Sequence, residues 1–175
     1  VQDYKSCVQC GSDIQNQLRG DKLSHILVIS DGGMVNGDEL VNGINRGLPE
    51  NVIVTGGLAA DAGRFDKTFV GLNGVPQPGK IVAIGHYGFD LKVAHGSMGG
   101  WDEFGPIRTV SKSRANILFE LDGQPALSVY KKYLGEKASE LPGAALLFPL
   151  SLYSKDRKTQ LVRTILSIDE EQESM

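Results

Sequence analysis

The amino-acid sequence predicts an α/β protein with mixed, largely antiparallel sheets flanked by helices, an arrangement that allows two sheet layers. Three observations lead to this fold class. A strand–loop–helix–strand pattern occupies residues 25–55. Short apolar runs separated by glycine- and proline-rich turns follow as far as residue 121, and a helical pattern begins at Pro125.

The first part of the chain carries the clearest element signals. Residues 4–18 place apolar side chains at helical spacing, and residues 25–30 form the continuous apolar run typical of a buried strand. Asn36, with Glu39 three positions later, resembles a capping box that opens a helix. The next strand is expected at residues 51–55. A strand, a helix and a strand in this order predict a parallel pair joined by a right-handed crossover.

The rest of the chain is expected to be antiparallel. Its predicted strands cover residues 68–73, 80–87, 89–95, 107–111, 116–121, 144–148 and 161–169. A helix is expected between Pro125 and Gly135, because proline suits the first turn of a helix and glycine suits its end. The acidic tail at residues 170–175 is expected to fray.

Composition narrows the class of protein. The chain has 175 residues, of which 41% are hydrophobic and 22% charged, as expected of one compact domain or two small lobes. A net charge of −3 argues against a nucleic-acid partner, which would need a basic surface. Pro149 interrupts the longest apolar run, and no membrane span or signal peptide is predicted, so we expect a cytoplasmic protein. The chain begins without Met, as a piece of a longer protein would.

Cys7 and Cys10 form a lone Cys-x-x-Cys pair. A structural zinc site needs about four ligands, and the sequence offers no second pair at matching spacing. A thioredoxin-like redox pair would follow a strand, and none precedes these residues. We therefore predict two packed or half-exposed thiols and no metal at this pair.

The most informative stretch for function runs from Val54 to Asn73. Gly56 and Gly57 follow an apolar strand and permit close approach to the backbone. Asp61 and Arg64 lie in the polar loop beyond them. An Arg fork suits a carboxylate and an Asp suits an ammonium group, so the pair is a candidate for holding both ends of an amino acid. The alternative is a structural ion pair or turn.

Three further positions are candidate ligand-binding residues. Asp31 ends a predicted strand and could line a crevice, although its loop matches neither phosphate-binding glycine pattern. Trp101, beside a glycine-rich corner, could cap a pocket or fill a joint between two lobes. His95 is a candidate for ligand binding as well.

His86 and His95 are also weak candidates for haem ligation. A single imidazole can hold haem iron if apolar walls surround it, and Tyr87, Phe89, Met98 and Trp101 are near enough in sequence to supply them. The alternative is that each histidine is hydrogen-bonded or solvated. Catalysis has less support, because the chain contains neither G-x-S-x-G nor H-E-x-x-H, and no catalytic residue is predicted.

Several short sequence stretches together resemble the FIST family of sensory domains. They are Ile29-Ser30-Asp31-Gly32, Gly56-Gly57-Leu58-Ala59-Ala60-Asp61 with Phe65 and Thr68, His95-Gly96, Gly100-Trp101, Phe104-Gly105-Pro106, Glu120 to Leu127 with Tyr130, Phe148-Pro149-Leu150, and Val162 to Leu166. The resemblance implies the C-terminal part of a FIST N-like domain at residues 1–105 and the start of a FIST C-like domain at residues 106–175, and we expect the two to pack as one unit. Family members usually extend further on both sides.

The resemblance implies an intracellular signal-transduction module that binds a small polar ligand such as an amino acid. Such modules pass their signal to kinases, cyclic-dinucleotide enzymes or chemotaxis receptors, which would be the partners. No resident cofactor is expected from this first hypothesis. The first alternative is a haem-based nitric oxide sensor, since some family members bind haem. The second is a structural or protein-interaction module that binds no small ligand.

Overall fold

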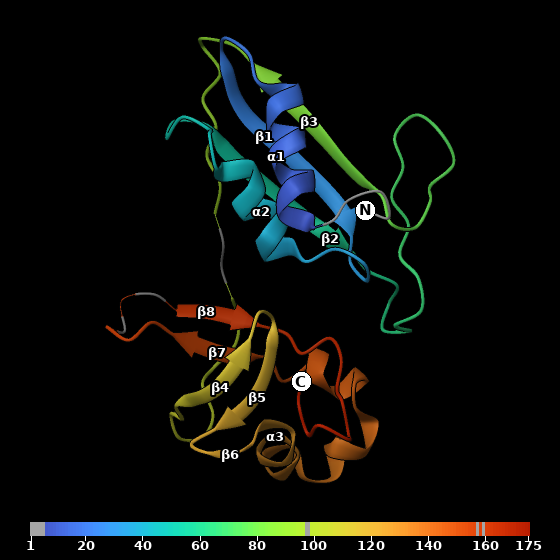
Figure 1. The fold of residues 1–175 in the computed structure, drawn as a ribbon, viewed down its shortest axis with the longest axis vertical. Helices are drawn as coiled ribbons and strands as arrows, with labels where there is room; N and C mark the ends of the chain where they lie inside the picture. The colour runs from blue at the N-terminus through green and yellow to red at the C-terminus, as the bar shows by residue number, and fades with distance from the viewer. Residues whose placement is uncertain (1–5, 97–98, 157, 159) are drawn as a thin grey trace. The chain divides into compact units, whose positions relative to one another are not determined.

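A computed structural model describes residues 6–96, 99–156, 158 and 160–175 of the chain. The chain forms two compact units, Val1–Ser97 and Met98–Met175 (Figure 1). The described residues contain three α-helices and three small sheets, and all strand pairs except one are antiparallel. The predicted mixed, largely antiparallel α/β class is therefore confirmed.

The sheet of the first unit has three strands in the order β2-β1-β3. They are β1 (Leu23–Asp31), β2 (Ile53–Ala59) and β3 (Ile81–Tyr87). Strands β1 and β2 are parallel and have a helix between them in sequence, which confirms the predicted parallel pair. Strand β3 runs antiparallel to β1 on its other side.

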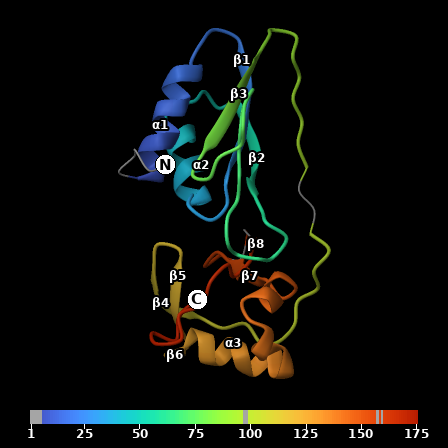
Figure 2. The same ribbon diagram turned by 90° about the vertical axis from the view of Figure 1, so that its right-hand side faces the viewer.

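Two helices cover one face of this sheet (Figure 2). They are α1 (Cys7–Leu18) and α2 (Gly37–Asn45). Side chains of Ser6 and Asn36 cap their N-termini by accepting hydrogen bonds from the backbone N–H groups of Gln9 and Glu39. The core between helices and sheet is formed by Cys7, Leu23, Ile26, Val28, Val35, Leu40, Ile44 and Val52.

The two helices approach each other closely because glycines face each other at their contact. A Cβ atom on Gly11 would lie 2.3 Å from the carbonyl oxygen of Leu40. One on Gly43 would lie 2.2 Å from the carbonyl oxygen of Val8. Only residues without a side chain fit at this distance, so the sequence of both helices fixes how tightly they pack.

Three expectations for the first unit differ from the structure. Residues 68–73 are not a strand, since only an isolated bridge joins Val70 to Gln77. Residues 89–95 also form no strand. Strand β2 continues beyond residue 55 through Gly56 and Gly57 to Ala59, because its backbone stays paired with β1 to the end.

The second unit begins with a hairpin of β4 (Val110–Arg114) and β5 (Ile117–Leu121), extended by β6 (Gln124–Pro125). The predicted helix follows as α3 (Ala126–Leu134). Two 3-10 helices, η1 (Gly135–Glu140) and η2 (Gly143–Leu146), lead to the hairpin of β7 (Leu150–Tyr153) and β8 (Gln160–Arg163). The core of this unit contains Tyr130, Ala145 and Ile165.

The expectations for residues 144–175 were partly wrong. Residues 144–148 do not form a strand, and the first three of them belong to the 3-10 helix η2. Of the strand predicted at residues 161–169, only the start is present, as part of β8. The acidic tail is packed rather than frayed. Met175 exchanges backbone hydrogen bonds with Leu118, and the carbonyl of Glu173 accepts from the N–H of Leu127 at the start of α3.

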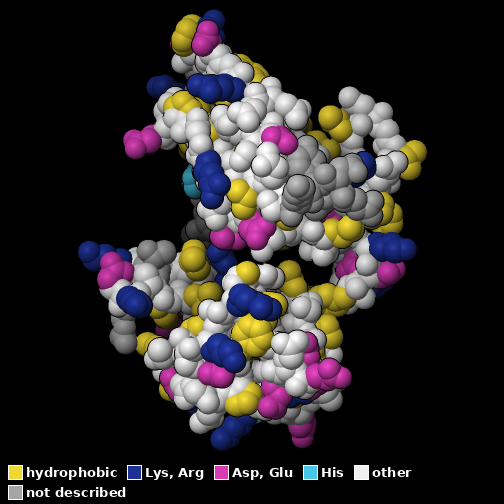
Figure 3. Space-filling model, viewed as in Figure 1, with side chains coloured by type: hydrophobic (Ala, Val, Ile, Leu, Met, Phe, Trp, Pro, Cys, Tyr) yellow, Lys and Arg dark blue, Asp and Glu magenta, His cyan; other side chains and the backbone are white. Residues whose placement is uncertain are grey.

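The visible surface of each unit mixes apolar, basic and acidic side chains (Figure 3). Among the residues that the structure describes, no helix has the length and apolar character needed to cross a membrane.

Candidate functional site

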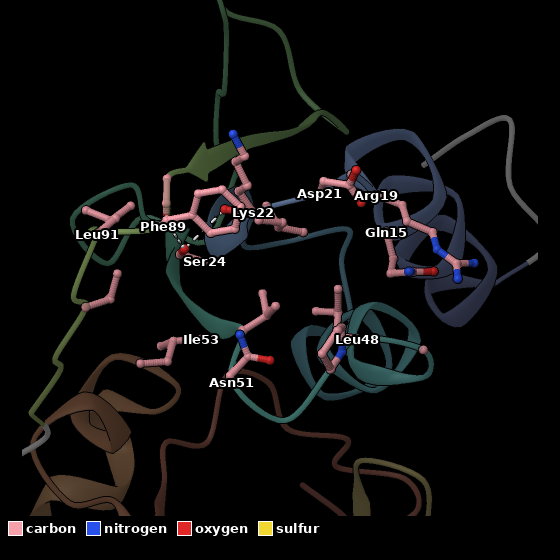
Figure 4. Close-up of a pocket in the computed structure, with 17 residues that line it drawn as sticks. Gln15, Arg19, Asp21, Lys22, Ser24, Leu48, Asn51, Ile53, Phe89 and Leu91 are labelled. Atoms are coloured by element: carbon pink, nitrogen blue, oxygen red, sulfur yellow. Dashed lines mark hydrogen bonds between the residues drawn. The ribbon is translucent and has the colours of Figure 1, made fainter.

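The larger of the two hollows described in the first unit is a cavity of about 790 Å³, which we call the α1-end cavity (Figure 4). It is lined by the end of α1, the turn into β1, the segment joining α2 to β2, and the residues that follow β3. Its size is in the range of small-molecule sites, about 300–1,000 Å³. The cavity forms because three chain segments end or turn at the same end of the sheet.

Gln15 is the most informative side chain in this cavity. The residue is only 7% exposed, and its side-chain amide makes no hydrogen bond with another described residue. The nitrogen and oxygen of this amide are not among the buried unpaired atoms of the described residues, so they are open to the cavity, where a polar group of a ligand can bond to them. Gln15 lies on the last turns of α1, close to Gly47 at the end of the α2 region.

Charged groups of both signs surround the cavity. Arg19, Asp21 and Lys22 lie in the exposed turn between α1 and β1, and Asn51 lies below them (Figure 4). Apolar side chains form the rest of the lining, among them Leu48 and Ile53. An apolar wall with a few polar groups at its edge is the usual composition of a small-ligand site.

The wall opposite Gln15 is held in place by contacts of the residues after β3 (Figure 4). The hydroxyl of Ser24 donates to the carbonyl of Gly88 at 3.0 Å, and the N–H of Gly88 donates to the carbonyl of Lys22 at 2.8 Å. These bonds position Phe89, whose ring centroid lies 4.3 Å from Nζ of Lys22.

A second hollow of about 570 Å³ lies near the start of the sheet and brings His25, Thr55, Gly56 and His95 together. Nε2 of His25 is 2.8 Å from Oγ1 of Thr55, and Nδ1 of His25 is 3.2 Å from Nδ1 of His86. Burial and the neighbouring His86 lower the pKa of His25 below its ordinary value.

Two of the predicted site residues, Gly56 and His95, therefore share a hollow. A Cβ atom on Gly56 would lie 1.9 Å from the carbonyl oxygen of Val28, so this glycine permits β2 to pair closely with β1. Gly57 is exposed, and no heavy atom lies within 4 Å of where its Cβ would be.

Asp31 lies at the end of β1 and is 1% exposed. Its carboxylate accepts hydrogen bonds of 2.8 Å from the N–H groups of Gly33, Met34 and Gly79. Burial acts to raise the pKa of Asp31, but these bonds and the Thr68 hydroxyl outweigh it and hold the pKa below its ordinary value. Asp31 lines neither hollow and joins two loops.

Asp61 and Arg64 lie in the loop after β2, and neither lines the two hollows described above. The carboxylate of Asp61 accepts a hydrogen bond of 2.7 Å from the N–H of Asp66. That bond, more than the positive charge of Arg64, lowers the pKa of Asp61. In this structure Asp61 thus shapes the turn after β2.

The sequence matches the FIST N domain over residues 2–124 and the FIST C domain over residues 126–175. The chain belongs to the FIST family. FIST is a family of sensory domains of signalling proteins, and the predicted resemblance is confirmed. No curated protein and no solved structure gave a significant match.

The two FIST matches and the two compact units divide the chain at different places. The units separate between Ser97 and Met98, whereas the FIST C match begins at residue 126, the first residue of α3. The strands β4 and β5 therefore belong to the FIST N match but lie in the second unit, where β5 pairs with β4 and packs with α3. The boundary expected from the sequence, at residues 105 and 106, lies between these two divisions.

Two of the aromatic residues considered as haem walls make other contacts within the first unit of this FIST chain. Tyr87 donates its hydroxyl to the carbonyl of Leu18, and Phe89 lines the α1-end cavity. Trp101 is 53% exposed and belongs to the second unit, and Met98 lies outside the described residues. The apolar residues at the second hollow are Val54, Val93 and Ala94, which are small beside a porphyrin.

The thiols of Cys7 and Cys10 are both buried and free. Sγ of Cys7 accepts a hydrogen bond from the N–H of Asn36, and burial raises the pKa of the Cys10 thiol. The packed arrangement agrees with the sequence expectation. Within the described part of the chain, no group of three or more His, Cys, Asp or Glu residues is arranged to hold a metal ion.

Sequence reasoning missed Gln15, Arg19 and Asn51 of the α1-end cavity. Gln15 and Arg19 lie at the end of α1, whereas Asn51 comes from the segment before β2. The three residues share no motif, so their proximity follows only from the packing of α1 against the sheet and α2. One signal was available: Gln15 occupies an apolar position of the helix, one residue after Ile14 and three before Leu18.

Proposed function

We propose that this FIST chain is a sensory module that binds a small polar metabolite, an amino acid in the first instance, in the α1-end cavity. The observation that supports the proposal is the side-chain amide of Gln15, which makes no hydrogen bond with another described residue and lines a cavity of about 790 Å³. A ligand that enters the cavity can use both the donor and the acceptor of this amide.

The charges around the cavity suit an amino acid. Arg19 and Lys22 are cations on the same turn and would attract a carboxylate, and Asp21 between them would attract an ammonium group. Leu48 and Ile53 offer an apolar surface for a side chain. Both charges of a zwitterion would therefore lie in the exposed turn while its apolar part is removed from water.

From the sequence, Asp61 and Arg64 are also candidates for binding both ends of an amino acid, and their loop is the second candidate location of the site. It offers the same pair of charges as the cavity. It lacks a lining of apolar residues, because the loop side chains from Ala62 to Lys67 are exposed. The two locations are separated by variants that change one and leave the other intact.

The experiment is a calorimetric titration of the chain with each common amino acid and with haemin. For the amino acid that binds, Gln15→Leu and Arg19→Ala should each weaken binding at least tenfold, while Arg64→Ala should leave it unchanged. Gln15→Leu keeps the size of the side chain, so a thermal unfolding control should show that α1 still packs. Weakened binding in Arg64→Ala, with normal binding in the other two variants, would move the site to the loop.

Signalling follows if the ligand binds one packing of the chain better than another. The ligand then shifts the equilibrium between them by its difference in affinity, and a linked output domain responds. In this proposal the ligand is a cytoplasmic metabolite and the partners are signalling proteins. Binding of haemin alone would favour the gas-sensor alternative. No saturable binding by any compound would favour an interaction module.

A further inference from the structure

All three histidines of the chain lie in its first unit, and two of them are in direct contact. His25 on β1 and His86 on β3 are register partners across the antiparallel pair, so their side chains project from the same face of the sheet. Their ring centroids are 5.1 Å apart and the ring planes differ by 24°.

We propose that His25 and His86 form a chelating site for a divalent transition-metal ion such as Zn²⁺, with Nδ1 of each ring as a ligand and water completing the coordination. The site has two protein ligands, which is consistent with the absence of any cluster of three or more His, Cys, Asp or Glu in the described chain. Imidazole is a preferred ligand of Zn²⁺, Cu²⁺ and Ni²⁺.

The distance between the two nitrogens fits this assignment. Two nitrogens that each lie about 2.0–2.1 Å from one metal, at the angles of octahedral or tetrahedral coordination, are roughly 2.9–3.4 Å apart. The Nδ1 atoms of His25 and His86 are 3.2 Å apart. His86 is exposed, so its ring has room to turn toward an ion shared with His25.

Thr55 supplies the outer contact that histidine ligands commonly have. Nε2 of His25 lies 2.8 Å from Oγ1 of Thr55 on the neighbouring strand β2. A proton on Nε2 that is donated to Thr55 leaves the Nδ1 lone pair of His25 directed at His86. When metal binds, His86 must also carry its proton on Nε2, so that its Nδ1 lone pair is free. Both rings stay neutral in this arrangement, and metal binding to the neutral pair releases no proton.

The test is a calorimetric titration of the chain with ZnCl₂ at pH 7.5, repeated with His86→Ala and Thr55→Val. We expect one ion per chain, with at least a tenfold loss of affinity in His86→Ala and a smaller loss in Thr55→Val. His86 is exposed, so the metal-free variant should unfold at the same temperature as the natural chain. Nuclear magnetic resonance of the imidazole nitrogens should show Zn²⁺ perturbing Nδ1 of both rings.

His95→Ala is the matched control, because it removes an exposed imidazole that lines the same hollow as His25 without a recorded contact to the pair. Retained Zn²⁺ affinity in His95→Ala together with its loss in His86→Ala supports the proposal. Retained affinity in His86→Ala would overturn it, and so would imidazole spectra that stay unchanged while Zn²⁺ binds, as they would if the ion went to Cys7 and Cys10.

Discussion

The backbone N–H of Gly79 donates a hydrogen bond of 2.8 Å to the carboxylate of Asp31, 48 residues earlier in the chain. The same carboxylate accepts from Gly33 and Met34 in the loop that leads to α2. One buried side chain at the end of β1 therefore fixes the loop before α2 and the turn before β3. An ionised carboxylate suits this role because it only accepts hydrogen bonds.

Asp31→Asn should destabilise the first unit by about 1–3 kcal/mol at pH 7, because the amide group would place donors against backbone donors. The Asp31 pKa is lower in the folded chain than in the unfolded chain, so its contribution is present above about pH 4 and is lost as the pH falls below that. Urea unfolding at pH 7 and pH 3 measures this. The gap between the natural chain and Asp31→Asn should narrow at pH 3, and an equal gap at both values would contradict the ionised carboxylate as its source.

Substitution by alanine should be costly at one of two neighbouring glycines in β2 and nearly neutral at the other. Gly56→Ala should cost at least about 2 kcal/mol, because its Cβ would collide with the carbonyl oxygen of Val28 and force β1 and β2 apart. Gly57→Ala should change the free energy of unfolding by no more than about 0.5 kcal/mol, since its Cβ meets nothing within 4 Å. Thermal unfolding followed by circular dichroism compares them, and similar losses would show that the strand spacing is not what requires Gly56.

The cap of α2 gives a third prediction. Asn36→Ala should destabilise the first unit by about 1 kcal/mol, because the N–H of Glu39 loses its acceptor at the first turn of the helix. Asn42→Ala is the matched control, as its side chain only reaches Asp38 on the exposed face of the same helix. Chemical denaturation should separate the two variants. Equal effects would mean that the cap contributes nothing beyond helix propensity.

The C-terminal segment should be necessary for the stability of the second unit. Removing residues 173–175 deletes the backbone pair between Met175 and Leu118 and the acceptor for the N–H of Leu127. We expect a loss of at least about 2 kcal/mol. Trp101 is the only tryptophan and belongs to this unit, so its fluorescence reports unfolding there. Glu171→Ala, which leaves these backbone bonds intact, should unfold at the same urea concentration as the natural chain.

The sequence was sufficient for elements whose signals are local. The cap at Asn36, the apolar run around Ile26 and the proline before α3 each act within a few residues, and the structure has α2, β1 and α3 at those places. Residues 144–148 show where local signals fail. An apolar run favours a strand, but Ala144 and Ala145 pack into the core from a 3-10 helix.

The α1-end cavity could not be predicted, because it depends on tertiary packing alone. Its lining residues come from three separate stretches of the chain, represented by Gln15, Asn51 and Phe89, and none of these is unusual in its own surroundings in the sequence. The contact between His25 and His86 was hidden for a related reason. It depends on the register of β1 with β3, and a shift of one residue would place the two rings on opposite faces of the sheet.

The packed tail also has a kinetic consequence. Strand β5 and helix α3 each obtain a backbone partner from residues 173–175, so the second unit contains contacts between segments far apart in the chain. A long loop must close before such contacts can form, and the entropy lost in closing it slows folding. During synthesis the first unit can fold as soon as β3 has left the ribosome, whereas the second unit must wait for Met175. The order of folding should therefore follow the order of the chain, with the hairpin β4–β5 exposed in the interval.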